Sequence, residues 1–592
     1  MLWHVPAFSG EVCDSVGTTG DNGSTANGGS AFSCGEDNTA DGSFGVSVGR
    51  NNRAAGTASS AFGNASWALG DSSTAVGHYS TAYGNDSSVF GASNQALSDG
   101  AMALGQYNYA YATNSSAVGA SNTVHGVASN AFGTSNLAYA DYSLALGVRA
   151  VIAPGATSSI AIGGGGPAAS GANINANAVS AIAIGSNVNV SEGASHAIAM
   201  GTNSTAGGVG SIAMGYAATA SQLDGIAIGS FSQAQAGASL ALGEATVASQ
   251  MYSVAIGSSS QAQAVGSVTL GKANFAQADF SLALGSTAIT SAGASGAIAI
   301  GGGNLTPGSG ASIGANAVSA IAIGSRVNVG EDASHAIAMG SDSSAIGVGS
   351  IALGQGASAA QDSALAIGVN SSAQSSGSIA LGLNAAAVQS NSVAIGSNAV
   401  AVSSVAVGTG AQATGTNTTA LGDNALAAGN LSVALGNNAQ AMHDNSVALG
   451  NASLTSDANT VSVGSAGNER RVTNVAGPVN ATDAVNKQYV DTLISTGSSD
   501  TLLQANAYTD QQIGALRKEA FRGIAQAAAL IPLAPAGAGE TTVNVGVATY
   551  GGETGGGIAV AHQLGSRLNL NGGVGFSSGG KSLVRAGMGW RF

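Results

Sequence analysis

The chain has 592 residues, of which glycine contributes 91, whereas charged residues make up only 7% and aromatic residues 5%. The formal net charge is −14, and most of the acidic groups lie in residues 1–465, so this part lacks the basic surface that nucleic-acid binding requires. Recurring Ile, Val and Leu argue against a disordered linker, and no apolar run reaches the roughly 18 residues of a transmembrane helix.

Residues 1–34 form an atypical N-terminal segment. They begin MLWHVPAFSGEVCDSVG, which has neither the basic n-region nor the apolar run of a secretory signal. We therefore expect an exported form of the protein to need a signal peptide that is missing from this stretch. A misplaced start codon, a fragment and a chain that is not exported are the alternatives. Cys13 and Cys34 fit either a disulfide or two unpaired cysteines.

Residues 35–465 repeat a fourteen-residue unit. An apolar-Ala-apolar-Gly tetrad ends at Gly257, again at Gly271 and again at Gly285. Each repeat contains two similar halves, and each half is typical of a short strand followed by a turn. The array therefore predicts a parallel β-solenoid of stacked coils, in which no single coil buries enough apolar surface to fold alone.

The strand pattern is clear in SVAIG, where Val254 and Ile256 alternate with Ser253 and Ala255. This alternation places the branched pair on one face and the small residues on the other. We expect the branched side chains to stack inside the coil. We expect the alanine face to pack closely against other copies of the chain. Gly257 permits the turn that comes next, because glycine reaches positive φ freely.

The period is broken twice in the same manner, by insertions at 163–185 and 301–324. The two breaks have similar sequences, which indicates that a whole block was duplicated. Insertions in solenoids form loops on one face, and that face is frequently a binding face. The alternative is a loop that duplication retained without a role.

After Gly464 the repeat gives way to NERRVTNVAGPVNATDAVNKQYV. Together with the fourteen-residue repeat, residues 470–476 and 482–486 of this stretch resemble the YadA-like trimeric autotransporter adhesins of type V secretion, which are built as head, neck, stalk and anchor. The resemblance implies a left-handed β-roll head packed as a homotrimer. It also implies a neck at 466–490, whose inter-chain contacts are made by Arg470, Arg471, Asn474 and Asp483.

Residues 491–535 are predicted to form a short stalk. Thr482 or Asp483 can cap a helix that continues through Tyr489, and the segment 497–500 interrupts it. A 4-3 spacing then predicts the core positions of a coiled coil with some polar occupants, which the family resemblance implies to be trimeric. These positions are Leu502, Asn506, Thr509, Ile513, Leu516, Ala520, Gly523 and Ala527. Fewer than four heptads are marginal alone, so the stalk depends on its neighbours.

Residues 536–592 return to a period of two in four stretches of about ten residues, a length that spans a bilayer as a tilted strand. Four strands would leave an open edge in lipid, whereas three chains can close a 12-stranded barrel. Phe592 resembles the C-terminal aromatic residue of outer-membrane β-barrels. The family resemblance implies an outer-membrane anchor that serves the protein's own translocation and is inserted by the barrel insertion machinery. An ordinary soluble antiparallel sheet is the alternative.

The sequence contains no catalytic constellation. The histidines have no paired carboxylate at a repeating spacing, and no GxxxxGK[ST] phosphate loop is present. His196 and His335 occupy equivalent places in SHAIAMG, where three copies could approach one ion, but an exposed histidine beside a strand explains them more simply. We expect no enzyme activity, no metal, no cofactor and no nucleic-acid partner.

The resulting prediction is an all-β-dominated adhesin on the bacterial outer membrane, with its head outside the cell. It would attach the cell to a host surface, an environmental surface or other cells, and so contribute to virulence, through many weak contacts. The ligand, of extracellular-matrix or cell-surface type, is unknown. A solenoid enzyme acting on polysaccharide is a second hypothesis, although the basic residues of the head do not cluster. A purely structural surface spacer is the third.

Overall fold

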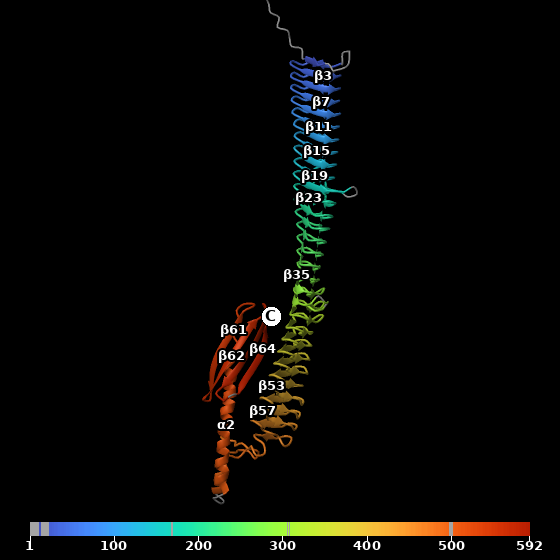
Figure 1. Ribbon diagram of the computed structural model, residues 1–592. Coiled ribbons are helices and arrows are strands. Elements are labelled where there is room, and N and C mark those ends of the chain that lie inside the picture. Colours follow the sequence, from blue (N-terminus) through green and yellow to red (C-terminus); the bar gives the residue numbers. More distant parts are fainter. Residues whose placement is uncertain are drawn as a thin grey trace, which may run out of the picture. The chain divides into compact units, whose positions relative to one another are not determined.

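In the computed structural model the chain forms two compact units, Met1–Arg326 and Val327–Phe592. The structure describes residues 11–13, 23–166, 170–304, 306, 308–495, 501–579 and 581–592. The first unit consists of coils with two short strands each. The second unit begins with coils of the same kind and continues into two helices and a four-stranded sheet (Figure 1).

Each coil contributes one strand to each of two parallel sheets. In one coil these strands are β33 (Val254–Ile256) and β34 (Gln261–Ala262), and in the next they are β35 (Val268–Lys272) and β36 (Phe275–Ala276). β33 pairs with β35 and β34 pairs with β36, both in parallel, so equivalent residues of successive coils stack directly. The predicted parallel solenoid of fourteen-residue coils is therefore confirmed.

The interior of the coil is lined by small residues. Ser253 and Ala255 are fully buried, whereas Val254 and Ile256 on the same strand remain partly exposed. The prediction that the branched pair fills the interior was wrong. A period of two defines two faces of a strand without saying which one points inward, and the inner strand faces of the fourteen-residue coils carry mainly alanine and serine, with valine at positions such as Val89 and Val124.

Polar side chains inside the coil are paired with the backbone. The fully buried Asn274 donates from Nδ2 to the carbonyl oxygens of Leu270 and Gly285, at 2.9 Å each. Its Oδ1 accepts the backbone N–H of Ala288 at 2.8 Å. One amide side chain therefore joins two successive coils, which removes the cost of burying unpaired polar groups in the turn.

Coils longer than fourteen residues enclose larger side chains. Their inner strands include β20 (Val151–Ile152), β22 (Ala172–Ile174), β24 (Val188–Val190), β40 (Ala311–Ile313) and β42 (Val327–Val329). The largest buried side chains of these strands are Ile152, Ile174, Val188, Val190, Ile313 and Val327. The longer coils therefore accept isoleucine and several valines, whereas the fourteen-residue coils hold mainly alanine, with valine at positions such as Val89 and Val124.

The two insertions are loops that leave the coil stack intact. The chain leaves the first sheet at the end of β21 (Ile160–Gly164) and re-enters the second sheet at β22, which pairs with β20 in register. The later break has the same form, between β39 (Ile298–Gly302) and β40, which pairs with β38 (Ile289–Thr290). The extra residues thus lie at 165–171 and 303–310, and the remainder of each predicted insertion forms an ordinary coil.

The C-terminal part contains α1 (Lys487–Ser495) and α2 (Thr501–Ala529), followed by the four predicted strands. These strands pair antiparallel in chain order, as β61 (Thr541–Tyr550), β62 (Glu553–Gln563), β63 (Leu568–Ser577) and β64 (Ser582–Trp590). Among the described residues, no helix is long and apolar enough to cross a membrane.

The start of α1 differs from the prediction. Asn486 caps this helix, because its Oδ1 accepts the backbone N–H of Tyr489 at 2.7 Å. The expected caps, Thr482 and Asp483, precede the helix and lie in a turn. Asn486 also donates from Nδ2 to the carbonyl oxygen of Val475 at 2.6 Å, so the cap ties the helix to the preceding chain.

Candidate functional site

The outer face of the first sheet carries rows of aliphatic side chains that the single chain leaves partly exposed. The flanking residues of each apolar-Ala-apolar tetrad form these rows, since register partners such as Ile226 and Leu240, or Ile228 and Leu242, stack from coil to coil. Leu242 is 38% exposed, whereas the alanine between the flanking residues is completely buried. Each chain therefore presents a long row of partly exposed aliphatic side chains along its coils, which we call the aliphatic stripe.

Arg470, for which inter-chain contacts stay a prediction, binds the last coils of its own solenoid. Its Nη1 donates to Ser453 Oγ at 2.7 Å and to the carbonyl oxygen of Val463 at 3.1 Å, and its Nη2 donates to the carbonyl oxygen of Asn451. After the last coil there is no further strand to bind these carbonyl groups, and a guanidinium group has enough N–H donors to bind several of them. Within this chain, Arg470 therefore closes the C-terminal end of the coil stack.

The other predicted neck residues lie nearby in the chain without forming one cluster. Asp483 Oδ2 accepts the backbone N–H groups of Val479 and Asn480, at 2.8 Å each. These two bonds, the one from Asn480 first, hold the pKa of the Asp483 carboxyl below its ordinary value. Asn474 is exposed with φ of +65°, and Arg471 is partly buried. Their inter-chain roles stay a prediction.

The remaining predicted residues lie at the two ends of the chain. β1 (Glu11–Cys13) pairs in parallel with β3 (Phe32–Glu36), and Cys13 is the register partner of Cys34. The backbone thus brings the two cysteines to neighbouring strands, but the side chain of Cys13 lies outside the described residues, so their pairing stays a prediction. Phe592, at the C-terminus, is fully exposed.

The C-terminal half of α2 packs on a glycine-lined face of the four-stranded sheet. A Cβ added to Gly546 would lie 2.4 Å from the carbonyl oxygen of Ala529, and one added to Gly555 would lie 2.5 Å from the backbone nitrogen of Gln526. Side chains at these glycines would collide with the helix backbone. The sheet therefore uses glycine to let a helix approach closely, a feature that our sequence reasoning missed.

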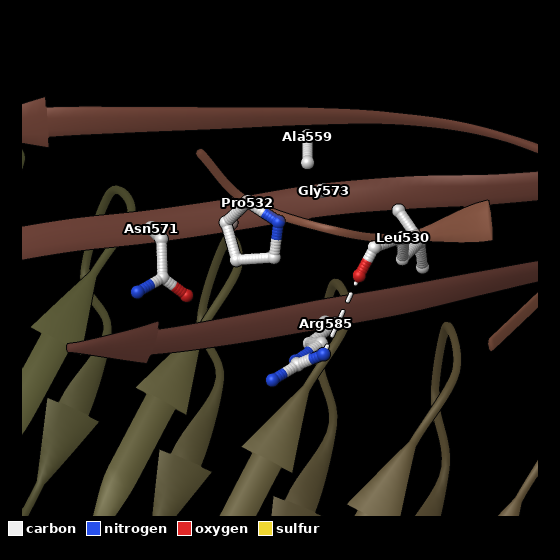
Figure 2. A pocket seen from close by; sticks show the side chains of 7 residues that line it. Leu530, Pro532, Ala559, Asn571, Gly573 and Arg585 are labelled. Carbon is white, nitrogen blue, oxygen red and sulfur yellow. Dashed lines mark hydrogen bonds between the residues drawn. The ribbon is translucent and has the colours of Figure 1, made fainter. Parts of the chain in front are cut away.

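Polar contacts fix the helix on the sheet. Arg522 Nε donates to Glu553 Oε2 at 2.6 Å, and Gln526 Nε2 donates to Ser577 Oγ at 2.7 Å. Just beyond the helix, Arg585 Nη1 donates to the carbonyl oxygen of Leu530 at 3.4 Å, in a shallow pocket shown in Figure 2. These contacts come from three of the four strands and hold the helix in one orientation.

The opposite face of the same sheet is apolar and exposed. On β61 the exposed side chains Val543, Val545 and Val547 alternate with residues that face α2, and Ile558 on β62 and Phe576 on β63 continue the pattern. This is the reverse of a soluble sheet packed on a helix, whose outer face is polar. The burial pattern fits a sheet whose outer face meets an apolar medium.

The described residues offer no catalytic or metal-binding arrangement. They contain no group of three or more His, Cys, Asp or Glu side chains that could hold a metal ion. His196 and His335 are exposed turn residues, both with φ of +61°. The pocket in Figure 2 is lined by Leu530, Pro532, Ala559, Asn571, Gly572, Gly573 and Arg585, which include no carboxylate that could act as a general acid or base.

Comparison with known families identifies both parts of the molecule. The YadA head domain repeat matches overlapping windows within 54–150, 194–260 and 332–466. The YadA-like membrane anchor domain matches residues 533–592, which include all four strands of the C-terminal sheet. The chain is a YadA-like trimeric autotransporter adhesin.

A solved structure is also similar to this YadA-like adhesin. It is the crystal structure of the collagen-binding domain of the Yersinia adhesin YadA, with 25% sequence identity over 34% of this chain and 97% of that chain, and a TM-score of 0.19. The families that match this YadA-like chain are adhesin and anchor families rather than enzyme families.

Proposed function

We propose that three copies of this YadA-like chain form an outer-membrane-anchored rod that attaches a bacterial cell to host surfaces, environmental surfaces or other cells. The aliphatic stripe of the head carries this proposal. A single chain leaves the stripe partly exposed along both units, whereas soluble proteins rarely expose contiguous apolar area of that size. Two neighbouring copies would cover it.

The anchor geometry supports a shared barrel. β61 and β64 are the edge strands of the sheet, and an open edge in lipid leaves backbone groups unpaired. Three copies would supply twelve strands, with Val543 and its equivalents toward lipid and α2 on the inner face. The exposed residues Leu516, Ala520 and Gly523 belong to the predicted heptad seam of α2, so three helices would meet there as a coiled-coil stalk.

Attachment would come from the repetitive surface of the head. A trimer presents every surface feature three times, so weak contacts add through avidity. A purely structural spacer would have the same rod and anchor but no ligand. The insertions at 165–171 and 303–310 are candidate binding elements, because they interrupt the regular repeat between β21 and β22 and between β39 and β40.

Two measurements test this function. The first is the mass of the purified protein in detergent after mild heating, where we expect three times the 56.2 kDa of one chain. A stable mass of one chain would contradict the shared barrel. The second is attachment of cells that display the protein, compared with cells that display only the neck, stalk and anchor, 466–592. Equal attachment by the two cell types would leave only the spacer function.

A further inference from the structure

The outer face of the second sheet carries an aromatic patch that spans six consecutive coils of the first unit, five of which contribute aromatic residues. The strands that form it are β8 (Trp67–Ala68), β10 (Thr81–Ala82), β12 (Gln95–Ala96), β14 (Tyr109–Ala110), β16 (Thr123–Val124) and β18 (Leu137–Ala138), paired in register. We define the aromatic patch by the residues that project outward on these strands or directly after them: Trp67, Tyr83, Tyr109, Tyr111, His125 and Tyr139.

Part of the aromatic patch is a stacked ladder. The rings of Tyr111 and His125 lie 4.3 Å apart at an interplanar angle of 4°, and those of His125 and Tyr139 lie 4.9 Å apart at 9°. Tyr109 stacks beside Tyr111, with ring centroids 6.1 Å apart. Stacking fixes the rings in place, so a partner meets a rigid row of aromatic edges and hydroxyl groups at little cost in side-chain entropy.

The coil itself does not need these aromatic residues. Trp67 and Tyr83 are 44% and 45% exposed, and Tyr111 and Tyr139 are each 38% exposed. Later coils of the same unit fold with polar residues in the same columns. When the strand pairing is followed from coil to coil, Thr205 takes the position that Tyr109 has in its coil. In the same way, Gln235 and Gln263 take the position that Tyr111, His125 and Tyr139 have in theirs.

The charges near the aromatic patch limit the kinds of molecule that it can bind. The sequence contains no Lys or Arg between Arg53 and Arg149, so the patch region has no fixed positive charge for sialylated or sulfated glycans, anionic lipids or nucleic acids. Its carboxylates are partly engaged, since Asp71, Asp99 and Asp141 each accept a backbone N–H of the preceding coil. That engagement weakens their attraction for a basic protein. The remaining surface is aromatic, hydroxyl and amide in character.

We propose that the aromatic patch binds neutral oligosaccharide chains, an assignment that rests on the proposed adhesin function and names its ligand class. A sugar ring alternates apolar C–H faces with hydroxyl groups. The exposed rings of Trp67 and Tyr83 can cover the C–H faces, and the tyrosine hydroxyls can exchange hydrogen bonds with sugar hydroxyls. Six coils spaced by about 4.8 Å span roughly 24 Å between the first and the last, which accommodates several sugar units of one chain.

The test uses the full-length trimer on an array of neutral hexose and N-acetylhexosamine oligosaccharides, with their sialylated and sulfated counterparts. The patch variant combines Trp67→Thr, Tyr111→Gln and Tyr139→Gln, the residue types found in equivalent columns. We expect at least a tenfold loss of binding to the neutral glycans. The matched control combines Tyr79→Asn, Tyr107→Asn and Tyr142→Asn, which removes three aromatic residues at turn positions with positive φ. It should bind within twofold of the unchanged protein.

Equal binding by the patch variant and the unchanged protein would overturn the proposal, as would no binding of the unchanged protein to any neutral glycan. Preference for the sulfated or sialylated glycans, or for a polylysine-coated spot, would also overturn it. Cell attachment separates this result from the proposed function. If displaying cells attach to a surface while the array stays empty, the glycan assignment fails and the adhesin function stands. Failure of both removes the adhesin function itself.

Discussion

At the residue scale, the fourteen-residue period is maintained by backbone contact between coils. Gly257 has φ of +117°, and a Cβ added there would lie 1.7 Å from the carbonyl oxygen of Gly271 in the next coil. Both constraints select glycine, since a side chain would be strained by its own backbone and would collide with the next coil. Most coils meet the same constraint at the same place, which explains the regular recurrence of the tetrad glycine; Gly163 and Gly301, where the insertions begin, are exceptions without a positive φ.

The buried alanine of each tetrad is expected to tolerate no enlargement. Ala255→Leu adds three carbons to a narrow interior, so we expect a loss of about 1–3 kcal/mol or more in the free energy of unfolding. Thermal unfolding of the full-length protein, followed by circular dichroism, measures the effect. Gln261→Leu on the outer face of the same coil is the control, with an expected change within about 0.5 kcal/mol. A larger loss from the control would contradict the assigned orientation.

The turn around Asp483 is expected to depend on pH. Its carboxyl has a pKa below the ordinary value of 3.8 because it accepts two backbone N–H bonds. The turn is therefore stabilised fully above that value, and the stabilisation is lost as the pH falls through the lowered pKa. Hydrogen-exchange protection of Val479 and Asn480, corrected for intrinsic rates, should persist from neutral pH to about pH 4 and fall below it.

In the Asp483→Ala variant this protection should already be several-fold lower at neutral pH. Asp457→Ala, in the last part of the coil stack, is the control and should leave the two amides protected. Unchanged protection in Asp483→Ala would show that its hydrogen bonds do not hold the turn.

At the scale of elements, α2 and the C-terminal sheet fold as one body. The helix contributes Arg522 and Gln526, the sheet contributes Glu553 and Ser577, and glycines such as Gly555 remove the side chains that would separate them. The predicted stalk, 491–535, therefore changes character along its length. Its C-terminal half has one face on the sheet and leaves the other for the predicted seam.

Gly555→Leu is expected to displace the helix from the sheet. The added side chain would collide with the backbone of Gln526, so we expect roughly a tenfold fall in heat-resistant protein recovered from the outer membrane, equivalent to about 1.4 kcal/mol. Gly589→Leu on β64 is the control, because a Cβ there meets nothing within 4 Å. Equal recovery of the two variants would argue against helix packing as the requirement.

At the scale of the whole molecule, the outer faces of the two sheets of the head have different functions in the proposed trimer. The first sheet presents the aliphatic stripe to other copies, and the second sheet presents its outer face to the surroundings. The stripe recurs in both units, whereas the aromatic patch occupies six coils of the first unit only. In the proposed trimer, contacts between copies would therefore be distributed along the head, whereas the proposed glycan recognition would be confined to the patch.

Polar substitution of the aliphatic stripe is expected to loosen the trimer without unfolding the coil. Fully burying one isoleucine side chain contributes about 1.5–3 kcal/mol, so the combined changes Ile212→Gln, Ile226→Gln and Ile228→Gln should open the trimer locally. Limited proteolysis should then cut within 205–232 at least tenfold faster. Thr205→Gln with Thr219→Gln on the second sheet is the control, and faster cleavage there would contradict the assignment of faces.

The amino-acid sequence by itself determined the repeat, its strands and turns, and the four C-terminal strands. These features depend on local periodicity and on glycine, which adjacent residues reveal. The family followed from the head repeat and the residues around Arg470 and Asp483. The packing of α2 on a glycine-lined sheet could not be predicted, because it depends on contacts between residues far apart in the sequence, such as Arg522 with Glu553 and Gln526 with Ser577.

Tertiary structure alone decided which face of each strand points inward. The sequence pattern places Ala255 and Ile256 on opposite faces of the strand but does not say which face points inward. Hydrophobicity alone favours Ile256, which in the structure points outward. The closed coil decides, because its two sheets lie close together and are filled mainly by alanine and serine, with valine at positions such as Val89 and Val124. The aliphatic flanking residues are therefore turned outward, and an apparent core becomes an outer surface of the chain.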